Sequence, residues 1–406
     1  MRHIIVGNGV AGTEAAKNIR KRDSLAEIII FTQDHYPFYS RPRLPEVLAR
    51  EAAAENIFVH NLEWYHTNKI QLYLNCSVKD VDPYNQGVSL ADGSRFAYDK
   101  LLFAMGSSGA LPPIEGISAS EGIFTMRTVG DVMAITRRAA RAKTVTLIGG
   151  GLLGLEAGNG LRKLGLSVTI VEIFGRLLPR QLDAEGAAML QKQMEDMGLR
   201  FVLGAKSKSI QDEGATKRLT LHDGRAIEGD FILVSAGVIP NIALARTAGA
   251  AVEKGIVVNG SMETNVPNIY AAGDVAEHKG RLYGIWPAAQ RQGVVAGTNM
   301  AGGHETYMGA VPFTTLKVAG IHLTSLGDVF TEDTTVEQIK VKDTVRNVYK
   351  KLFLKEGKLI GAIFLGDTKH AYEMGQIMER KVDVGKYKEK LLDATFDIKT
   401  LLSAQT

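Results

Sequence analysis

The stretch LIGGGLLGLEA at residues 147–157 repeats a pattern that the chain has already used at residues 4–15, IIVGNGVAGTEA. Both copies place Gly-x-Gly-x-x-Gly between an aliphatic run and a helix-like segment, which is the context of a dinucleotide-binding turn. In such a turn the glycines permit a tight bend, the approach of a pyrophosphate and close packing of helix on strand. The repeat therefore predicts two nucleotide sites. The glycines are Gly7, Gly9 and Gly12 in the first copy, and Gly149, Gly151 and Gly154 in the second.

The second copy is followed by LSVTIVE, which ends in Glu172. An acidic residue about 20 residues after the glycines binds the ribose hydroxyls of NAD. The next basic residue is Arg176, so a 2′-phosphate has no evident partner and the pattern favours NADH over NADPH. The pyrophosphate is expected at the helix N-terminus, beside Leu152 and Leu153.

The first copy departs from this pattern, because AEIIIFTQD places Thr32 where the acid is expected and Asp34 two residues later. A nucleotide there would be held by many contacts along the chain, as a resident FAD is, with Val10 and Ala11 at the helix N-terminus. The expected cofactors are therefore a bound FAD and an exchanging NADH.

The bulk composition excludes several classes of protein. A chain of 406 residues with 45% hydrophobic and 23% charged residues is typical of a globular protein of two or three domains. No apolar stretch is long enough for a membrane span, and the N-terminus enters a strand at once, which predicts a cytoplasmic protein without a signal peptide. The net charge of +4 is too small to indicate nucleic-acid binding, and the single cysteine, Cys76, excludes an internal disulfide.

The predicted fold class is α/β, with two Rossmann-like dinucleotide-binding domains, one inserted in the other, and a C-terminal α+β domain. Clusters of Pro and Gly at residues 106–116 and 237–241 indicate the crossings between the two nucleotide domains. We expect an FAD-binding domain at residues 1–110 and 238–307, an NADH-binding domain at 111–237, and the C-terminal domain at 308–406.

The motifs GNGVAG, FAMGSS, GGGLLGLE, SAGVIPN and NIYAAGDVAE, in this order, resemble the two-dinucleotide-binding flavoproteins of the glutathione reductase fold. The resemblance implies that Asp274, in the last motif, binds FAD. FAMGSS carries Met105 where that family has Thr. The Cys-x-x-x-x-Cys pair of the disulfide reductases is missing, and Cys76 lies in a strand-like segment, so a flavin would deliver electrons directly.

PFYSRPRLPEVLA is similar to the Y-x-R-x-x-L segment of NADH:rubredoxin oxidoreductases and of the FAD module of assimilatory nitrite reductase large subunits. This resemblance implies that Arg41 contacts FAD, that Lys317 of TTLKVAG lies by the flavin, and that Glu156 positions the nicotinamide. Glu156 could instead be a plain helix-surface carboxylate. No metal ligands are predicted. The FAD-site residues expected outside the glycine turn are Thr32, Gln33, Arg41, Val78, Gly106, Arg127, Asp274, Ile285 and Lys317.

The resulting prediction is an FAD enzyme that oxidises NADH and passes electrons to a small acidic iron protein, most simply rubredoxin. The alternatives are an NADH oxidase or quinone reductase, and a redox-sensing or assembly protein with little turnover. A basic run is a candidate docking face for the acceptor, or else the solvated face of strands. The acceptor, the strictness for NADH, a second flavin and a homodimer stay open. The basic residues of the run are Lys340, Lys342, Arg346, Lys350, Lys351, Lys355 and Lys358.

Overall fold

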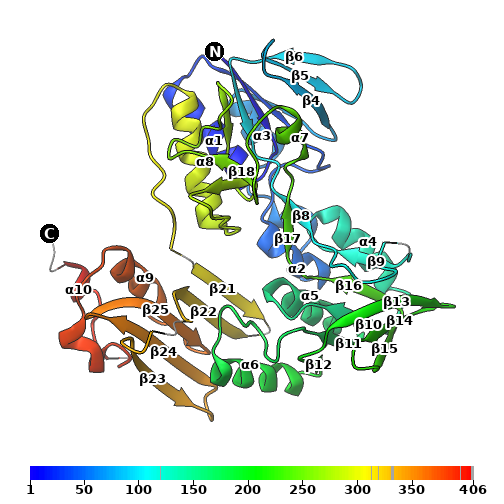
Figure 1. Ribbon diagram of the computed structural model, residues 1–406, viewed down its shortest axis with the longest axis vertical. Coiled ribbons are helices and arrows are strands. Elements are labelled where there is room, and N and C mark those ends of the chain that lie inside the picture. Colours follow the sequence, from blue (N-terminus) through cyan, green and yellow to red (C-terminus); the bar gives the residue numbers. More distant parts are fainter. Residues whose placement is uncertain (119, 312, 319, 331–332, 394, 404–406) are drawn as a thin grey trace.

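The computed structural model describes residues 1–118, 120–311, 313–318, 320–330, 333–393 and 395–403, and it has three lobes (Figure 1). The upper lobe, the first unit, combines the blue start of the chain with the yellow helix α8 (Trp286–Met300). The green lobe is the second unit, and the orange and red lobe contains the C-terminal sheet. Among the described residues, no helix has the length and apolar character of a membrane span.

A five-stranded parallel sheet forms the centre of the first unit, in the order β19-β7-β1-β2-β3. Its strands are rich in Ile, Leu and Phe because both faces are covered, and Ile4, Ile28 and Phe103 are fully buried. β19 pairs with β7 although a whole unit of chain separates them. The strands are β1 (Arg2–Val6), β2 (Glu27–Phe31), β3 (Ile70–Tyr73), β7 (Lys100–Phe103) and β19 (Ile269–Ala271).

The second unit repeats this arrangement with a parallel sheet in the order β12-β11-β10-β16-β9. Each unit also carries an antiparallel three-stranded sheet, and the ribbon β8–β17 joins the two units. The predicted fold class is therefore confirmed. The strands are β9 (Ile123–Thr125), β10 (Thr144–Ile148), β11 (Ser167–Val171), β12 (Arg200–Val202) and β16 (Phe231–Val234), with β4 (Val78–Asp82), β5 (Gly87–Leu90), β6 (Arg95–Ala97), β13 (Ser207–Glu213), β14 (Thr216–Leu221), β15 (Ala226–Gly229), β8 (Ser107–Gly109), β17 (Val238–Pro240), β18 (Ile256–Val258) and β20 (Ala276–His278).

Helices α1 (Val10–Arg22) and α8 pack closely on each other because glycines on α8 leave no side chain between them. A Cβ on Gly293 would lie 2.4 Å from the carbonyl oxygen of Ala11, and one on Gly297 would lie 2.3 Å from that of Ala15. This contact fixes the start of α1, where the first glycine turn ends. The other helices are α2 (Leu44–Leu48), α3 (Leu62–Thr67), α4 (Val129–Ala139), α5 (Leu152–Lys163), α6 (Ala184–Asp196), α7 (Ala243–Thr247), α9 (Ala371–Glu379) and α10 (Thr400–Ser403).

The C-terminal sheet is antiparallel, in the order β21-β22-β25-β24-β23. One face packs on α9, and the other shares a core with the second unit, in which Tyr349 and Ile363 lie in one apolar cluster with Leu182 and Leu190. The C-terminal sheet is therefore built onto the second unit. Its strands are β21 (Phe313–Val318), β22 (Ile321–Gly327), β23 (Glu337–Asp343), β24 (Val348–Lys355) and β25 (Lys358–Leu365).

The predicted docking face on β23 and β24 stays a prediction, although several of its lysines already form ion pairs within the molecule. Lys350 pairs with Asp367 at 2.6 Å and its side chain is only 7% exposed, so Lys350 itself is available neither to a docking partner nor to solvent. Lys351 binds Asp183, at the start of α6, at 2.7 Å. The remaining paired lysines are Lys340 and Lys342, both with Glu185, and Lys355 with Asp333.

Candidate functional site

The first glycine turn joins β1 to α1 and has the backbone that a dinucleotide turn requires. Gly7 has a φ of +114°, and a Cβ there would lie 2.1 Å from the carbonyl oxygen of Ala104, directly after the neighbouring strand β7. A Cβ on Gly12 would lie 2.1 Å from the carbonyl oxygen of Gly7. α1 begins after Gly9 without a side-chain cap, so the first N–H groups of the helix, beside Val10 and Ala11, are available to an anion.

The second glycine turn, between β10 and α5, has almost the same backbone. Gly149 has a φ of +112°, and a Cβ there would lie 2.3 Å from the carbonyl oxygen of Ser235. A Cβ on Gly154 would lie 2.1 Å from the carbonyl oxygen of Gly149. Gly151 caps α5 without a side-chain bond and borders open space among the described residues, next to Leu152 and Leu153. Both turns therefore leave a cradle at a helix N-terminus.

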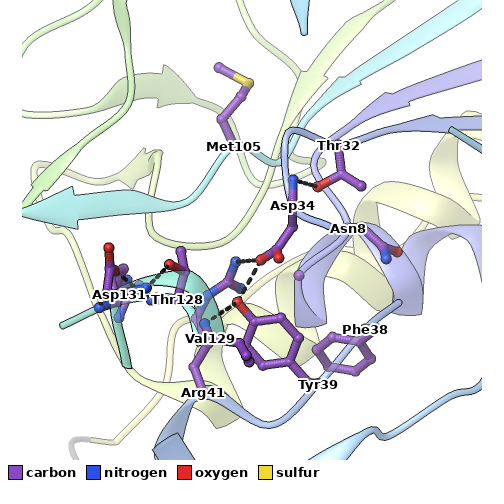
Figure 2. Close-up of polar contacts among 12 residues, drawn as sticks. Asn8, Thr32, Asp34, Phe38, Tyr39, Arg41, Met105, Thr128, Val129 and Asp131 are labelled. Atoms are coloured by element: carbon purple, nitrogen blue, oxygen red, sulfur yellow. Dashed lines mark hydrogen bonds and ion pairs between the residues drawn. The ribbon is translucent and has the colours of Figure 1, made fainter. Parts of the chain in front are cut away.

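A partly buried cation, Arg41, lies over the first cradle. Figure 2 shows Tyr39, Asp34 and Arg41 pointing toward one another near the start of α4. The Nη1 atom of Arg41 is 3.2 Å from the position of a Cβ on Gly9, and its Nη2 atom is 3.8 Å from Oδ2 of Asp34. The Nε of Arg41 is buried and has no hydrogen-bond partner in the described part of the chain. A helix N-terminus and an incompletely bonded guanidinium together fit a pyrophosphate.

Asp274 lies beside this cradle, held by residues that come from both units. Its Oδ2 accepts a 2.7 Å hydrogen bond from Ser107 Oγ and forms an ion pair with the Arg127 guanidinium. Arg127 also donates to the carbonyl oxygen and to Oγ of Ser107, at 3.1 and 2.8 Å. A Cβ on Gly273 would lie 3.0 Å from the Cβ of Ala11, which places Asp274 next to the start of α1.

The other residues predicted for the first site border it at different edges. The hydroxyl of Thr32 accepts the backbone N–H of Asp34 at 3.2 Å, so Thr32 shapes the turn after β2. Gln33 is exposed and bonds Ser77 Oγ at 2.8 Å, next to Val78 at the start of β4. Gly106 and Ile285 are also among the predicted residues, and their backbone conformation is what distinguishes them. Gly106 has a φ of +66°, and Ile285 is the N-cap of α8.

Glu172 closes the second cradle at the end of β11. The side chain is buried, and its carboxylate accepts the backbone N–H of Gly150 at 2.6 Å and that of Phe174 at 2.9 Å. Each carboxylate oxygen keeps a further lone pair for a ribose hydroxyl. Arg176 is turned away, since its guanidinium donates to the carbonyl oxygens of Leu182 and Pro179, each at 3.3 Å.

Glu156 on α5 and Lys317 on β21 are brought together, although the sequence assigned them to different cofactors. The backbone N–H of Lys317 bonds the Glu156 carboxyl, while the Lys317 side chain is exposed. Burial raises the pKa of Glu156 to about 7, the Lys317 N–H works against this rise, and Glu46 on α2 adds to it. Glu156 is therefore not the plain surface carboxylate that was the alternative.

Asp34 and Ser107 belong to the site, but the sequence did not assign them to it. Asp34 had attracted notice only as a displaced ribose acid, and Ser107 only as part of FAMGSS. No sequence signal connects Ser107 to Asp274, because the contact joins β8 to the segment after β19, 167 residues further along the chain. Cys76 is half-buried, and burial raises the pKa of its thiol, which does not suit a nucleophile.

Comparison with known families matches residues 1–293 to the pyridine nucleotide-disulphide oxidoreductase family. Residues 312–382 match the rubredoxin NAD+ reductase C-terminal domain. The family comprises FAD-binding reductases that use NAD(P)H, and the two cradles fit such cofactors.

Among curated proteins, the chain is 36% identical over 97% of its length to an assimilatory nitrate reductase electron transfer subunit from Bacillus subtilis, of which it covers 51%. It is 30% identical to an NADH-dependent phenylglyoxylate dehydrogenase subunit epsilon from Aromatoleum evansii, with 100% of this chain and 98% of the relative covered. The chain spans about half the length of the first curated relatives it matches. Among solved structures, NADH:rubredoxin oxidoreductase from Clostridium acetobutylicum has a TM-score of 0.77 at 27% identity, with 94% of this chain and 95% of that chain covered.

Proposed function

Because the chain belongs to the pyridine nucleotide-disulphide oxidoreductase family, we propose that it is an FAD-dependent enzyme that oxidises NADH and passes electrons to rubredoxin or a similar small acidic iron protein. The observation that carries the proposal is the pair of equivalent glycine turns, one beneath the Arg41 guanidinium and the other beside the Glu172 carboxylate. When bound, FAD accepts a hydride from NADH and can release electrons singly, which suits an iron acceptor.

The residues of the chain have distinct tasks in this proposal. Arg41 and the start of α1 bind the FAD pyrophosphate, and Asp274, held by Arg127, binds the sugar portion of FAD. Glu172 binds the NADH ribose and disfavours a 2′-phosphate by charge repulsion. Glu156 orients the nicotinamide near the place where β21 covers α5, and Lys317 lies at this edge.

The choice of acceptor rests on the C-terminal match and on the cysteine content. Residues 312–382 resemble the C-terminal domain of rubredoxin reductases. Within these 406 residues there is one cysteine, so a dithiol within this chain cannot relay electrons. Electrons would therefore leave the flavin directly, and the C-terminal match favours a docked protein as their acceptor.

A second candidate is an NADH-linked subunit that reduces a partner subunit of a larger enzyme. The names of two relatives favour it, because one is an electron transfer subunit and another is subunit epsilon of a dehydrogenase. In this case the site residues would have the same tasks, and only the acceptor would differ.

Anaerobic stopped-flow spectroscopy tests the proposal. The protein is reduced with NADH and then mixed with oxidised rubredoxin, while flavin and iron absorbance are followed. Fast reduction and fast coupled reoxidation support rubredoxin as the acceptor. Fast reduction with slow reoxidation by rubredoxin would favour the subunit candidate, or a quinone or oxygen if either of these reoxidises the flavin quickly. Slow reduction by NADH would contradict the enzyme function and favour a sensing or assembly role.

A further inference from the structure

Asp34 has no role in the proposed function so far, yet its position is unusually well determined. Its backbone N–H bonds the hydroxyl of Thr32, and its carbonyl oxygen accepts the N–H of Asn75 at 3.0 Å. Its carboxylate Oδ2 accepts the hydroxyl of Tyr39 at 2.5 Å, and its side chain is 12% exposed. Hydrogen bonds thus hold the backbone N–H, the carbonyl oxygen and the carboxylate of Asp34. A carboxylate held in this way can attract a cation to one fixed position.

The cation at that location is Arg41. The separation of 3.8 Å between Arg41 Nη2 and Asp34 Oδ2 is too long for a hydrogen bond but short enough for strong attraction between partly buried charges. Asp34 therefore attracts the guanidinium without using its N–H groups. The Arg41 Cζ also lies 5.4 Å from the centre of the Tyr39 ring, which restricts its movement on a second side.

Tyr39 links this arrangement to α4 of the second unit. Its hydroxyl, which donates to Asp34, accepts the backbone N–H of Val129 at 3.3 Å, at the first residue of α4. Burial raises the pKa of the Tyr39 phenol, so the hydroxyl keeps its proton at neutral pH. The start of α4 is itself fixed, because Thr128 and Asp131 form a capping box (Figure 2).

We propose that Asp34 is a positioning residue that holds the Arg41 guanidinium over the N-terminus of α1, so that its free N–H groups meet an anionic phosphate ligand. The inference rests on the proposed function in that FAD is the ligand. Without Asp34, a partly buried guanidinium would turn toward solvent to recover its missing hydrogen bonds. Asp34 thus favours an anion although its own charge is negative.

The sign of the effect gives a sharp test, because an Asp near a phosphate site weakens binding if it acts only through charge. FAD is removed from the purified holoenzyme, and its dissociation constant is measured by flavin fluorescence for wild type, Asp34→Asn, Arg41→Ala and the double variant. Asp80→Asn, on an exposed strand position, is the matched control. We expect Asp34→Asn to weaken FAD binding about tenfold, and the control to leave it unchanged.

In the Arg41→Ala background the same substitution is expected to leave FAD affinity unchanged or to tighten it, because the group that Asp34 positions is gone. Unchanged or tighter FAD binding by Asp34→Asn alone would overturn the proposal. Equal weakening in both backgrounds would also overturn it, because Asp34 would then contact the ligand itself. NADH binding at the second site reports whether each variant is folded. If Asp34→Asn does not fold, Tyr39→Phe replaces it, and we expect Tyr39→Phe to weaken FAD binding as well. Failure of wild type to bind FAD would instead contradict the proposed function.

Discussion

Asp183 is expected to be the main polar attachment of the C-terminal sheet to the second unit. It caps α6 through the N–H of Gly186 at 3.0 Å and accepts Tyr349 Oη at 2.6 Å and Lys351 Nζ at 2.7 Å. The side chains of Lys351 and Asp183 are only 13% and 19% exposed, so this ion pair is far less screened than a surface pair. Replacing Asp183 with Ala removes all three contacts and leaves a nearly buried ammonium group without its partner.

The magnitude follows from these contacts. Loss of an N-cap costs about 1 kcal/mol. Loss of hydrogen bonds to a charged group costs about 1.5–3 kcal/mol each, and because neighbouring contacts do not add fully we expect a total near 3 kcal/mol. For a cooperative unit of this size, that loss corresponds to roughly 6–12 °C in the unfolding midpoint.

Calorimetry is the appropriate assay, because both tryptophans, Trp64 and Trp286, lie in the first unit and would not report on the C-terminal sheet. Glu185→Gln is the matched control. Its carboxylate binds Lys340 and Lys342 on the same strand pair but is 41% exposed, so its loss should cost less than about 1 kcal/mol. A midpoint for Asp183→Ala no lower than that of Glu185→Gln would refute the reasoning.

Three further variants test the nucleotide sites. Glu172→Ala should weaken NADH binding by about 10- to 100-fold, through lost hydrogen bonds to a charged group, and NADPH binding much less, as measured by fluorescence titration. Burial raises the pKa of Glu156 to about 7 in the folded protein, against an ordinary 4.5. The free energy of unfolding of the wild type should therefore fall, relative to that of Glu156→Gln, as the pH rises from 4.5 through 7. Urea unfolding of both proteins at several pH values measures this difference, and a difference that does not change with pH would contradict the prediction. Gly297→Val should separate α1 from α8 and release flavin during gel filtration, whereas Gly175→Ala, where no described atom lies within 4 Å of the new Cβ, should retain it.

The two glycine turns could be predicted from the sequence because their geometry is local. Each depends on a glycine with a left-handed φ and on another that touches its carbonyl oxygen a few residues away. The parallel sheets follow from the same units, since their strands are apolar throughout. Chain order and spacing therefore contained most of the information for these parts of the fold.

The position of the C-terminal sheet could not be predicted in the same way. The charged residues at 340–358 indicate that one face of the strands is polar and mainly basic, but they do not show whether solvent, a docked protein or another part of the chain covers it. The partners are Asp183 and Glu185, and the contact of Lys340 with Glu185 spans 155 residues of sequence. A pattern within one segment does not show which distant helix packs against it.

Two turns with nearly the same backbone conformation can bind two different nucleotides because their surroundings differ in charge and in the number of contacts. The first turn lies under a guanidinium that is fixed by Asp34 and Tyr39, and contacts from both units surround it, so a ligand there would have to break many of them to leave. The second turn offers a preformed carboxylate, Glu172, and an open approach at Gly151. A fixed cation with many contacts favours a resident nucleotide, whereas a few preformed contacts at an open edge favour one that exchanges at every turnover. This difference follows from side chains outside the glycine motif, which is why the repeat itself could not assign the two sites.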